Sequence, residues 1–154
     1  VHMGVLEGDS AVYVLKIESR YTISMFSRVG RRIPLYCTAI GKTLLADMDE
    51  DQRAAAIAGM KLVPFTPNTI RDAAALGAEL ERIKAEGISA DAEEHEAGVT
   101  CLAAPIRDHS GRVVAAISTS WPVFRYDASR RDEYAARIAQ AAAEISAILG
   151  DAVL

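Results

Sequence analysis

The order in which hydrophobic patterns follow one another limits the fold of this chain more than any other feature. Alternation with a period of two, typical of strands, marks residues 2–6 and 11–18 around a turn at 7–10, and residues 23–27 form a further short candidate strand. Helical spacing then takes over, two-residue alternation returns, and a long helical pattern ends the chain. This order predicts an α+β fold. Because hairpins connect the strands, we expect a mainly antiparallel sheet of about six strands, flanked by helices.

Local signals set the limits of the predicted helices. Thr38 occupies the N-cap position of a helix over 38–48, and Gly87 is the stop signal of a helix over 72–86. Between these two, a further helix runs from residue 49 or 50 to 58. Three strands follow, over 88–94, 99–107 and 112–121. The long C-terminal helix covers 129–149, and one of its faces carries Tyr134, Ile138, Ala141, Ile145 and Leu149.

Composition excludes several classes of protein. The 154 residues are 51% hydrophobic, enough for a single domain over 1–154 with a sizeable core. The net charge of −4 argues against nucleic-acid binding by this segment, and no run of about 18 apolar residues supports a membrane span. The first residues show no signal-peptide layout. Cys37 and Cys101 do not have zinc-ligand spacing, so we expect a reduced, cytoplasmic protein without a metal or cofactor.

The segment 27–46 holds the first candidate binding feature. A basic turn with Arg28, Arg31 and Arg32 leads into the predicted helix start at Thr38. The first N–H groups of a helix have no intrahelical partner and point outward, where they attract anions. The segment therefore predicts a site for a small carboxylate.

Two serines on the last predicted strand are the second feature. Ser118 and Ser120 point to one face, because side chains two residues apart share a face of a strand. The neighbouring strand 99–107 presents Val99 and Cys101 on one face. Two hydroxyl groups and a thiol can line a small polar pocket there. The alternative is that the serines are buried and bond to the backbone without any further role.

Asp91, in the strand 88–94, has two readings. It belongs either to a solvated polar face or to a ligand site, where it accepts a hydrogen bond from a hydroxyl group or a hydrate. Near a ligand carboxylate it would be repelled or take up a proton. The following run Glu93–Glu96 contains metal-binding residue types, but consecutive side chains diverge, so a solvated charge run is favoured.

Cys101 also raises the possibility of a thiol-dependent enzyme. A nucleophilic thiol needs a nearby base or a positive field. His95 is expected to lie beyond hydrogen-bond reach of Cys101, and His109 falls in an exposed turn. We therefore expect no catalytic residues, and a small enzyme that uses Cys101 stands as the alternative to a binding domain.

Four segments, taken together, resemble a known family in order and spacing. They are 27–42 (SRVGRRIPLYCTAIGK), 66–70 (TPNTI), 98–106 (GVTCLAAPI) and 111–120 (GRVVAAISTS). Over essentially its whole length, the chain resembles the C-terminal effector-binding domain of the IclR family of bacterial transcription regulators.

This resemblance implies a GAF-like α+β domain that senses a small molecule and is not an enzyme. The effector would be a small organic acid, such as a 2-oxo acid, a sugar acid or an aromatic acid. Its binding would modulate DNA binding by biasing the arrangement of a homodimer or homotetramer. DNA contact would belong to an N-terminal winged helix-turn-helix, which we do not find in this chain. A pure oligomerisation module is a further alternative.

The resemblance also implies which residues bind the effector. Backbone N–H groups at Ala39 and Ile40 would hold the carboxylate, and Asp91 would take a hydroxyl group or a hydrated carbonyl. Cys101 would be a pocket wall and weak donor. The remaining positions are Ser118 and Ser120, the apolar wall residues Met25 and Val99, and Thr22 as a weaker candidate. The chain departs from the family pattern at Ile40, Tyr36 and Trp121, where we expect a change in pocket size.

Overall fold

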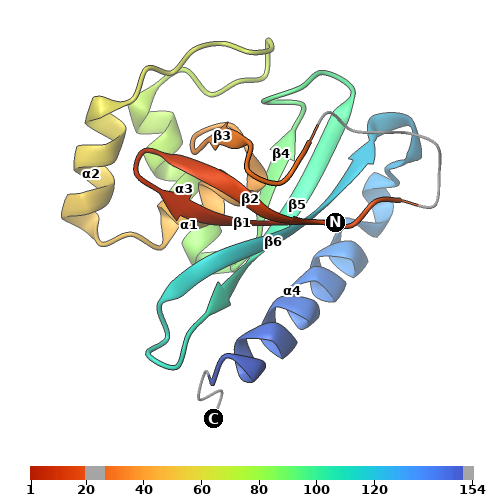
Figure 1. Cartoon of the computed structure of the whole chain (residues 1–154). Helices are drawn as coiled ribbons and strands as arrows, with labels where there is room; N and C mark the ends of the chain where they lie inside the picture. The colour runs from red at the N-terminus through yellow and green to blue at the C-terminus, as the bar shows by residue number, and fades with distance from the viewer. Residues whose placement is uncertain (20–26, 151–154) are drawn as a thin grey trace.

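Six antiparallel strands form one sheet in the part of the chain that the structure describes. The computed structural model describes residues 1–19 and 27–150. The strand order is β3-β2-β1-β6-β5-β4, so that the N-terminal hairpin lies next to the last strand (Figure 1). The strands are β1 (His2–Glu7), β2 (Ser10–Lys16), β3 (Arg32–Pro34), β4 (Ser89–Ala92), β5 (Val99–Arg107) and β6 (Val113–Pro122). The predicted α+β class and antiparallel sheet are confirmed.

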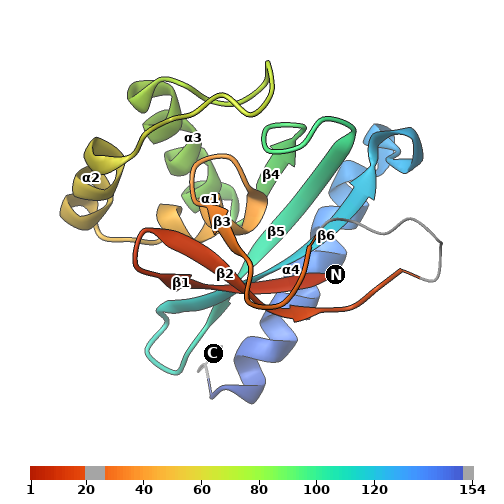
Figure 2. The same ribbon diagram turned by 45° about the horizontal axis from the view of Figure 1, so that its top comes forward.

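The helices cover both faces of the sheet (Figure 2). They are α1 (Ala39–Ala46), α2 (Glu50–Gly59), α3 (Ala73–Glu86) and α4 (Arg131–Ile148), with short 3₁₀ turns at Val123–Arg125 and Ala128–Arg130. On one face, α1 and α3 bury Leu45 and Leu80 against sheet residues such as Ala116. On the other face, α4 buries Ile138 against Leu102 and its neighbours. Because successive side chains of a strand point to opposite faces, β5 and β6 contribute residues to both hydrophobic cores.

Side-chain caps fix the helix limits close to the predicted ones. Asp49 accepts a hydrogen bond from the N–H of Gln52 at the start of α2, and Asp72 accepts one from Ala75 at the start of α3. Gly87 ends α3 with a φ of 71°, a left-handed conformation that glycine adopts without steric cost. The helix signals in the sequence therefore correspond to real helix ends.

The structure differs from the sequence-based prediction at two places. A short strand, β3, forms within the segment predicted as a basic turn. Ile33 is buried there and pairs with Ala11 of β2. The predicted strand 23–27 lies almost wholly outside the described residues. At the C-terminal end, Leu149 follows α4 and is half exposed, whereas Ser146 on α4 is buried in the helix–sheet contact. The Ser146 hydroxyl accepts from the N–H of Arg107 and donates to the carbonyl of Ala142, so burial leaves it satisfied.

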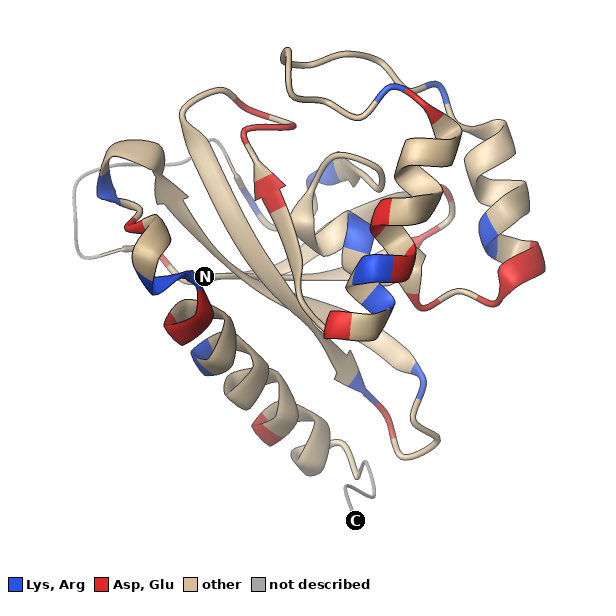
Figure 3. Ribbon diagram, turned by 180° about the vertical axis from the view of Figure 1, so that it is seen from behind, with Lys and Arg blue, Asp and Glu red and all other residues tan. Residues whose placement is uncertain are grey.

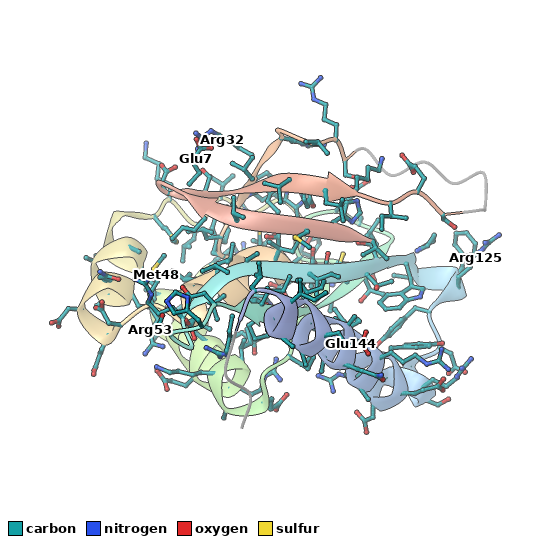
Figure 4. The ribbon with its side chains drawn as sticks, turned by 60° about the horizontal axis from the view of Figure 1, so that its bottom comes forward. Glu7, Arg32, Met48, Arg53, Arg125 and Glu144 are labelled. Atoms are coloured by element: carbon teal, nitrogen blue, oxygen red, sulfur yellow. The ribbon has the colours of Figure 1, made fainter. Side chains whose placement is uncertain are left out.

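Charged residues of both signs are mixed on the surface. Figure 3 shows them interspersed along α3 and α4, in keeping with a net charge of −4. Figure 4 shows Glu7 beside Arg32, an ion pair of 3.0 Å that joins β1 to β3, while Glu144 lies on α4. Within residues 1–19 and 27–150, no helix is long and apolar enough to span a membrane.

Candidate functional site

A small cavity lies between the start of α1 and the sheet face that α1 covers. Its volume is about 40 Å³, on a scale where a single water molecule needs roughly 10–15 Å³. The floor is a row of side chains that crosses the sheet: Asp91 pairs in register with Cys101, Cys101 with Ser120, and Ser118 with His2. Residues distant in sequence thus meet because their strands are neighbours. The lining includes Ala39, Ile40, Asp91, Val99, Cys101, Ser118 and Ser120.

The start of α1 presents two backbone donors to this cavity. The Thr38 hydroxyl accepts from the N–H of Gly41, and the Thr38 carbonyl accepts from the N–H of Lys42. The preceding N–H groups, of Ala39 and Ile40, have no hydrogen-bond partner among the described residues, and both residues line the cavity. Together with the positive end of the helix dipole, they form a site suited to an anion.

Two glycines bring this helix start close to the sheet. A Cβ atom on Gly41 would lie 2.5 Å from the carbonyl oxygen of Pro34, so the turn before α1 requires glycine there. A Cβ atom on Gly4 of β1 would lie 2.8 Å from Cγ2 of Ile40. Part of the Ile40 side chain therefore packs over Gly4, which provides the room that this bulky residue needs.

The two serines differ in their hydrogen bonding. The Cys101 thiol donates to the Ser120 hydroxyl over 3.1 Å. Ser118 is 4% exposed, and no described residue forms a hydrogen bond with its hydroxyl group. The alternative that both serines serve the backbone is therefore wrong for the described part of the chain. Burial raises the pKa of the Cys101 thiol to about 12, which opposes formation of a reactive thiolate at neutral pH.

Asp91 is a buried carboxyl group at the β4 end of the row. It is 5% exposed, so the solvated-face interpretation is wrong. Its Oδ1 accepts from the N–H groups of Glu94 and His95, over 2.7 and 3.4 Å. Burial nevertheless raises the pKa of Asp91 to about 7. Near neutral pH, the group can therefore accept a hydrogen bond as a carboxylate or donate one as an acid.

An ion-pair network holds the turn after Asp91 against the helices. The Lys42 ammonium group lies 2.6 Å from Oε1 of Glu94 and 3.3 Å from Oε1 of Glu79 on α3. Glu93 turns the other way, and its Oε2 accepts from the N–H of Gly98. The acidic side chains therefore diverge as predicted, but the prediction of a solvated charge run is wrong for Glu94, which is 8% exposed and paired with Lys42. Within the described ranges, no three His, Cys, Asp or Glu side chains gather as a metal site would require.

The remaining predicted positions divide into two groups: two that the structure does not describe and two that lie away from this cavity. Met25 and Thr22 lie outside the described residues. The Tyr36 hydroxyl donates to the carbonyl of Val63, and Trp121 stacks on Tyr134 at the α4 side of the sheet. Of the three departures from the family pattern, Ile40 is therefore the one that lines the cavity.

Sequence reasoning missed several residues that line the cavity. They include His2, Tyr13, Ser27, Ile33 and His95. The alternation in the first hairpin indicated which residues share a face with Tyr13. It contained no signal that β1 pairs with β6, a step that brings His2 beside Ser118.

Comparison with known proteins gives a consistent result. The family model described as bacterial transcriptional regulator IclR C-terminal matches residues 1–147. The chain is 43% identical over 150 residues to the HTH-type transcriptional regulator KdgR of Escherichia coli, covering 97% of this chain and 57% of that protein. The chain thus spans little more than half the length of this curated relative.

Solved structures show the same likeness. The C-terminal domain of E. coli KdgR is similar with a TM-score of 0.87 and 40% identity, covering 97% of this chain and 86% of that one. An IclR homolog from Microbacterium hydrocarbonoxydans, complexed with 4-hydroxybenzoate, gives a TM-score of 0.85 and 26% identity over 96% of this chain and 59% of the homolog.

Proposed function

Since this chain belongs to the IclR family, as its C-terminal domain, we propose that it is the effector-sensing part of a bacterial transcription regulator. The observation that carries this proposal is the cavity beside α1, where two backbone N–H groups and the Ser118 hydroxyl have no partner among the described residues. Buried polar groups normally find partners. A small organic acid supplies the matching acceptors.

The binding mode follows from the positions of the donors and of Asp91. The carboxylate meets the N–H groups of Ala39 and Ile40 and the hydroxyl groups of Ser118 and Ser120. Asp91 takes a hydroxyl group or hydrated carbonyl at the other end, and Cys101 and Val99 form walls. Candidate effectors are 2-oxo acids, sugar acids and aromatic acids; the complex of the Microbacterium homolog with 4-hydroxybenzoate supports the last class.

Regulation requires that the effector prefer one arrangement of the protein over another. We place this choice in a homodimer or homotetramer, and we assign DNA contact to a part of the protein outside this chain. The greater length of the curated relative supports that assignment. The relative is a transcription regulator, and such a role for this protein also favours a cytoplasmic location. An enzyme built on Cys101 is disfavoured because burial raises the pKa of this thiol to about 12.

A panel of organic acids tests the site. Thermal shift with wild-type protein identifies the acids that bind, and their dissociation constants are then compared in a Ser118→Ala/Ser120→Ala variant. Hydrogen bonds to a charged group are worth about 1.5–3 kcal/mol each, so we expect at least a tenfold loss of affinity. Ser110→Ala, in the exposed turn before β6, is the matched control. Unchanged affinity in the double variant would refute the site.

Sedimentation velocity tests the regulatory step. With an acid that binds, we expect the distribution of dimers and tetramers to change in wild-type protein but not in the double serine variant. An acid that binds without moving this distribution contradicts regulation through assembly, while leaving the site itself in place.

A further inference from the structure

His2 is a buried polar residue in the floor of the cavity. It lies on β1 directly opposite Ser118 of β6, and it is 4% exposed. Its ring packs against the ring of Tyr13 on β2, with 5.0 Å between the ring centroids. His2 and Tyr13 thus extend the polar row of Asp91, Cys101 and the serines across the other half of the sheet.

The two ring nitrogens of His2 have different surroundings. Nε2 shares a hydrogen bond of 2.7 Å with the Ser27 hydroxyl. Nδ1 is buried, and no described group forms a hydrogen bond with it. Burial lowers the pKa of His2 to about 4, with a smaller contribution from the positive charge of Lys16. The ring is therefore neutral at pH 7 and offers one donor and one acceptor.

A neutral imidazole is a better hydrogen-bond partner for an uncharged oxygen of the ligand than for its carboxylate. The carboxylate position is already served by the α1 donors and Ser118. Because neighbouring strands are about 5 Å apart, His2 on β1 lies one strand from Ser118, while Asp91 on β4 lies two strands away on the other side, about 10 Å. An oxygen on the carbon next to the carboxylate is thus within reach of His2, whereas Asp91 meets more distant atoms.

We propose that His2 is a specificity-determining residue, which recognises a 2-oxo or 2-hydroxy group next to the effector's carboxylate. This inference rests on the proposed function and narrows it to short aliphatic acids that carry an oxygen at carbon 2. A volume of about 40 Å³ and polar side chains on both sides of the serines fit such an acid better than a benzoate, which has a ring carbon at that position.

Three-carbon acids that differ at a single position provide the test. Pyruvate, lactate and propionate share a carboxylate and chain length, and they carry an oxo group, a hydroxyl group and no oxygen at carbon 2. Isothermal titration calorimetry gives their dissociation constants for wild-type protein, His2→Phe and Ser118→Ala. His2→Phe keeps a ring against Tyr13 and removes both nitrogens. His2→Leu replaces it if the phenylalanine variant does not fold.

We expect wild-type protein to bind pyruvate or lactate about tenfold more tightly than propionate, since one hydrogen bond distinguishes them. His2→Phe should abolish this preference and leave propionate binding within about twofold of wild type. His2→Asn, whose amide takes the place of Nδ1, should retain part of the preference. Ser118→Ala should weaken all three acids together.

Several results would overturn the inference. A preference that survives in His2→Phe, an equal loss for all three acids, or wild-type binding of aromatic acids alone would each remove the role of His2 while leaving an effector domain in place. If no organic acid of the wider panel binds wild-type protein, the proposed function fails and this inference fails with it.

Discussion

Lys42→Met is a sharp test of how the cavity is held together. The Lys42 side chain is completely buried, and its ammonium group contacts the Glu94 carboxylate over 2.6 Å. The Glu94 backbone N–H in turn donates to Asp91 over 2.7 Å. Lys42 on α1 therefore anchors the turn that carries one end of the cavity. Methionine has a similar length but cannot neutralise Glu94.

The expected cost follows from what the substitution leaves behind. Glu94 is 8% exposed, and its Oε2 already has no hydrogen-bond partner among the described residues. Glu79 is less affected, because it keeps Arg82 at 2.9 Å. Removing one partner of a buried ion pair costs about 3–5 kcal/mol, so we expect the free energy of unfolding to fall by that amount. Domains of this size have about 5–15 kcal/mol of stability, so the variant should remain folded but be fragile.

Urea unfolding at a fixed protein concentration measures this change, with circular dichroism and Trp121 fluorescence as probes. The matched control is Lys42→Met/Glu94→Leu, in which no charge is left buried. This double variant should be more stable than Lys42→Met by about 2 kcal/mol or more. The reasoning is refuted if Lys42→Met costs less than about 1 kcal/mol, or if the second substitution adds to the loss.

Two further predictions concern titratable groups in the floor of the cavity. Because burial raises the folded pKa of Asp91 to about 7, its contribution to stability is fully present below about pH 4 and is lost as the pH rises toward 7. In urea unfolding from pH 4 to 8, the stability of Asp91→Asn relative to wild type should therefore rise by up to about 1.4 kcal/mol per pH unit between pH 4 and 7 and level off above pH 7. A difference that does not change with pH would contradict the buried acid. Cys101 should react with iodoacetamide at pH 7 at least about 100-fold more slowly than in the urea-unfolded chain, since a rise in its pKa from 9.0 to about 12 lowers the thiolate fraction about 1,000-fold. Rapid, stoichiometric labelling of this residue, followed by peptide mass spectrometry, would instead support a thiol-dependent enzyme.

Long periodic patterns made most of the fold predictable from the sequence. The strands β5 and β6 and the helices α1 to α4 fall within a few residues of their predicted limits, because alternation and capping act locally. The pairing of Cys101 with Ser120 was also accessible, since a single short turn connects β5 to β6. Strand β3 could not be predicted from the sequence, because three residues are too few to show a period. Its residue Ile33 is held by pairing with Ala11 of β2.

Other features of the site depend on contacts between distant parts of the chain. His2 lies beside Ser118 through a strand pairing that spans most of the sequence, and no local pattern encodes it. Lysine is usually exposed, so no local pattern predicts that Lys42 is buried. Its burial depends on Glu94, 52 residues further along the chain. The positions of such buried polar residues depend on the tertiary structure, and local propensity does not predict them.

The close contact between Ile40 and Gly4 shows how cavity size is set. Ile40 supplies one of the two helix-start donors through its backbone, while its side chain packs within van der Waals reach of Gly4. A side chain at position 4 would push against Ile40, and because Gly41 is fixed against Pro34, the helix start has little room to move away. Position 4 is also two residues from His2 on the same strand. The spacing between the helix-start N–H groups and His2 therefore depends on the pair Gly4 and Ile40. If the proposed binding mode holds, we predict that this pair sets the size of acid that binds.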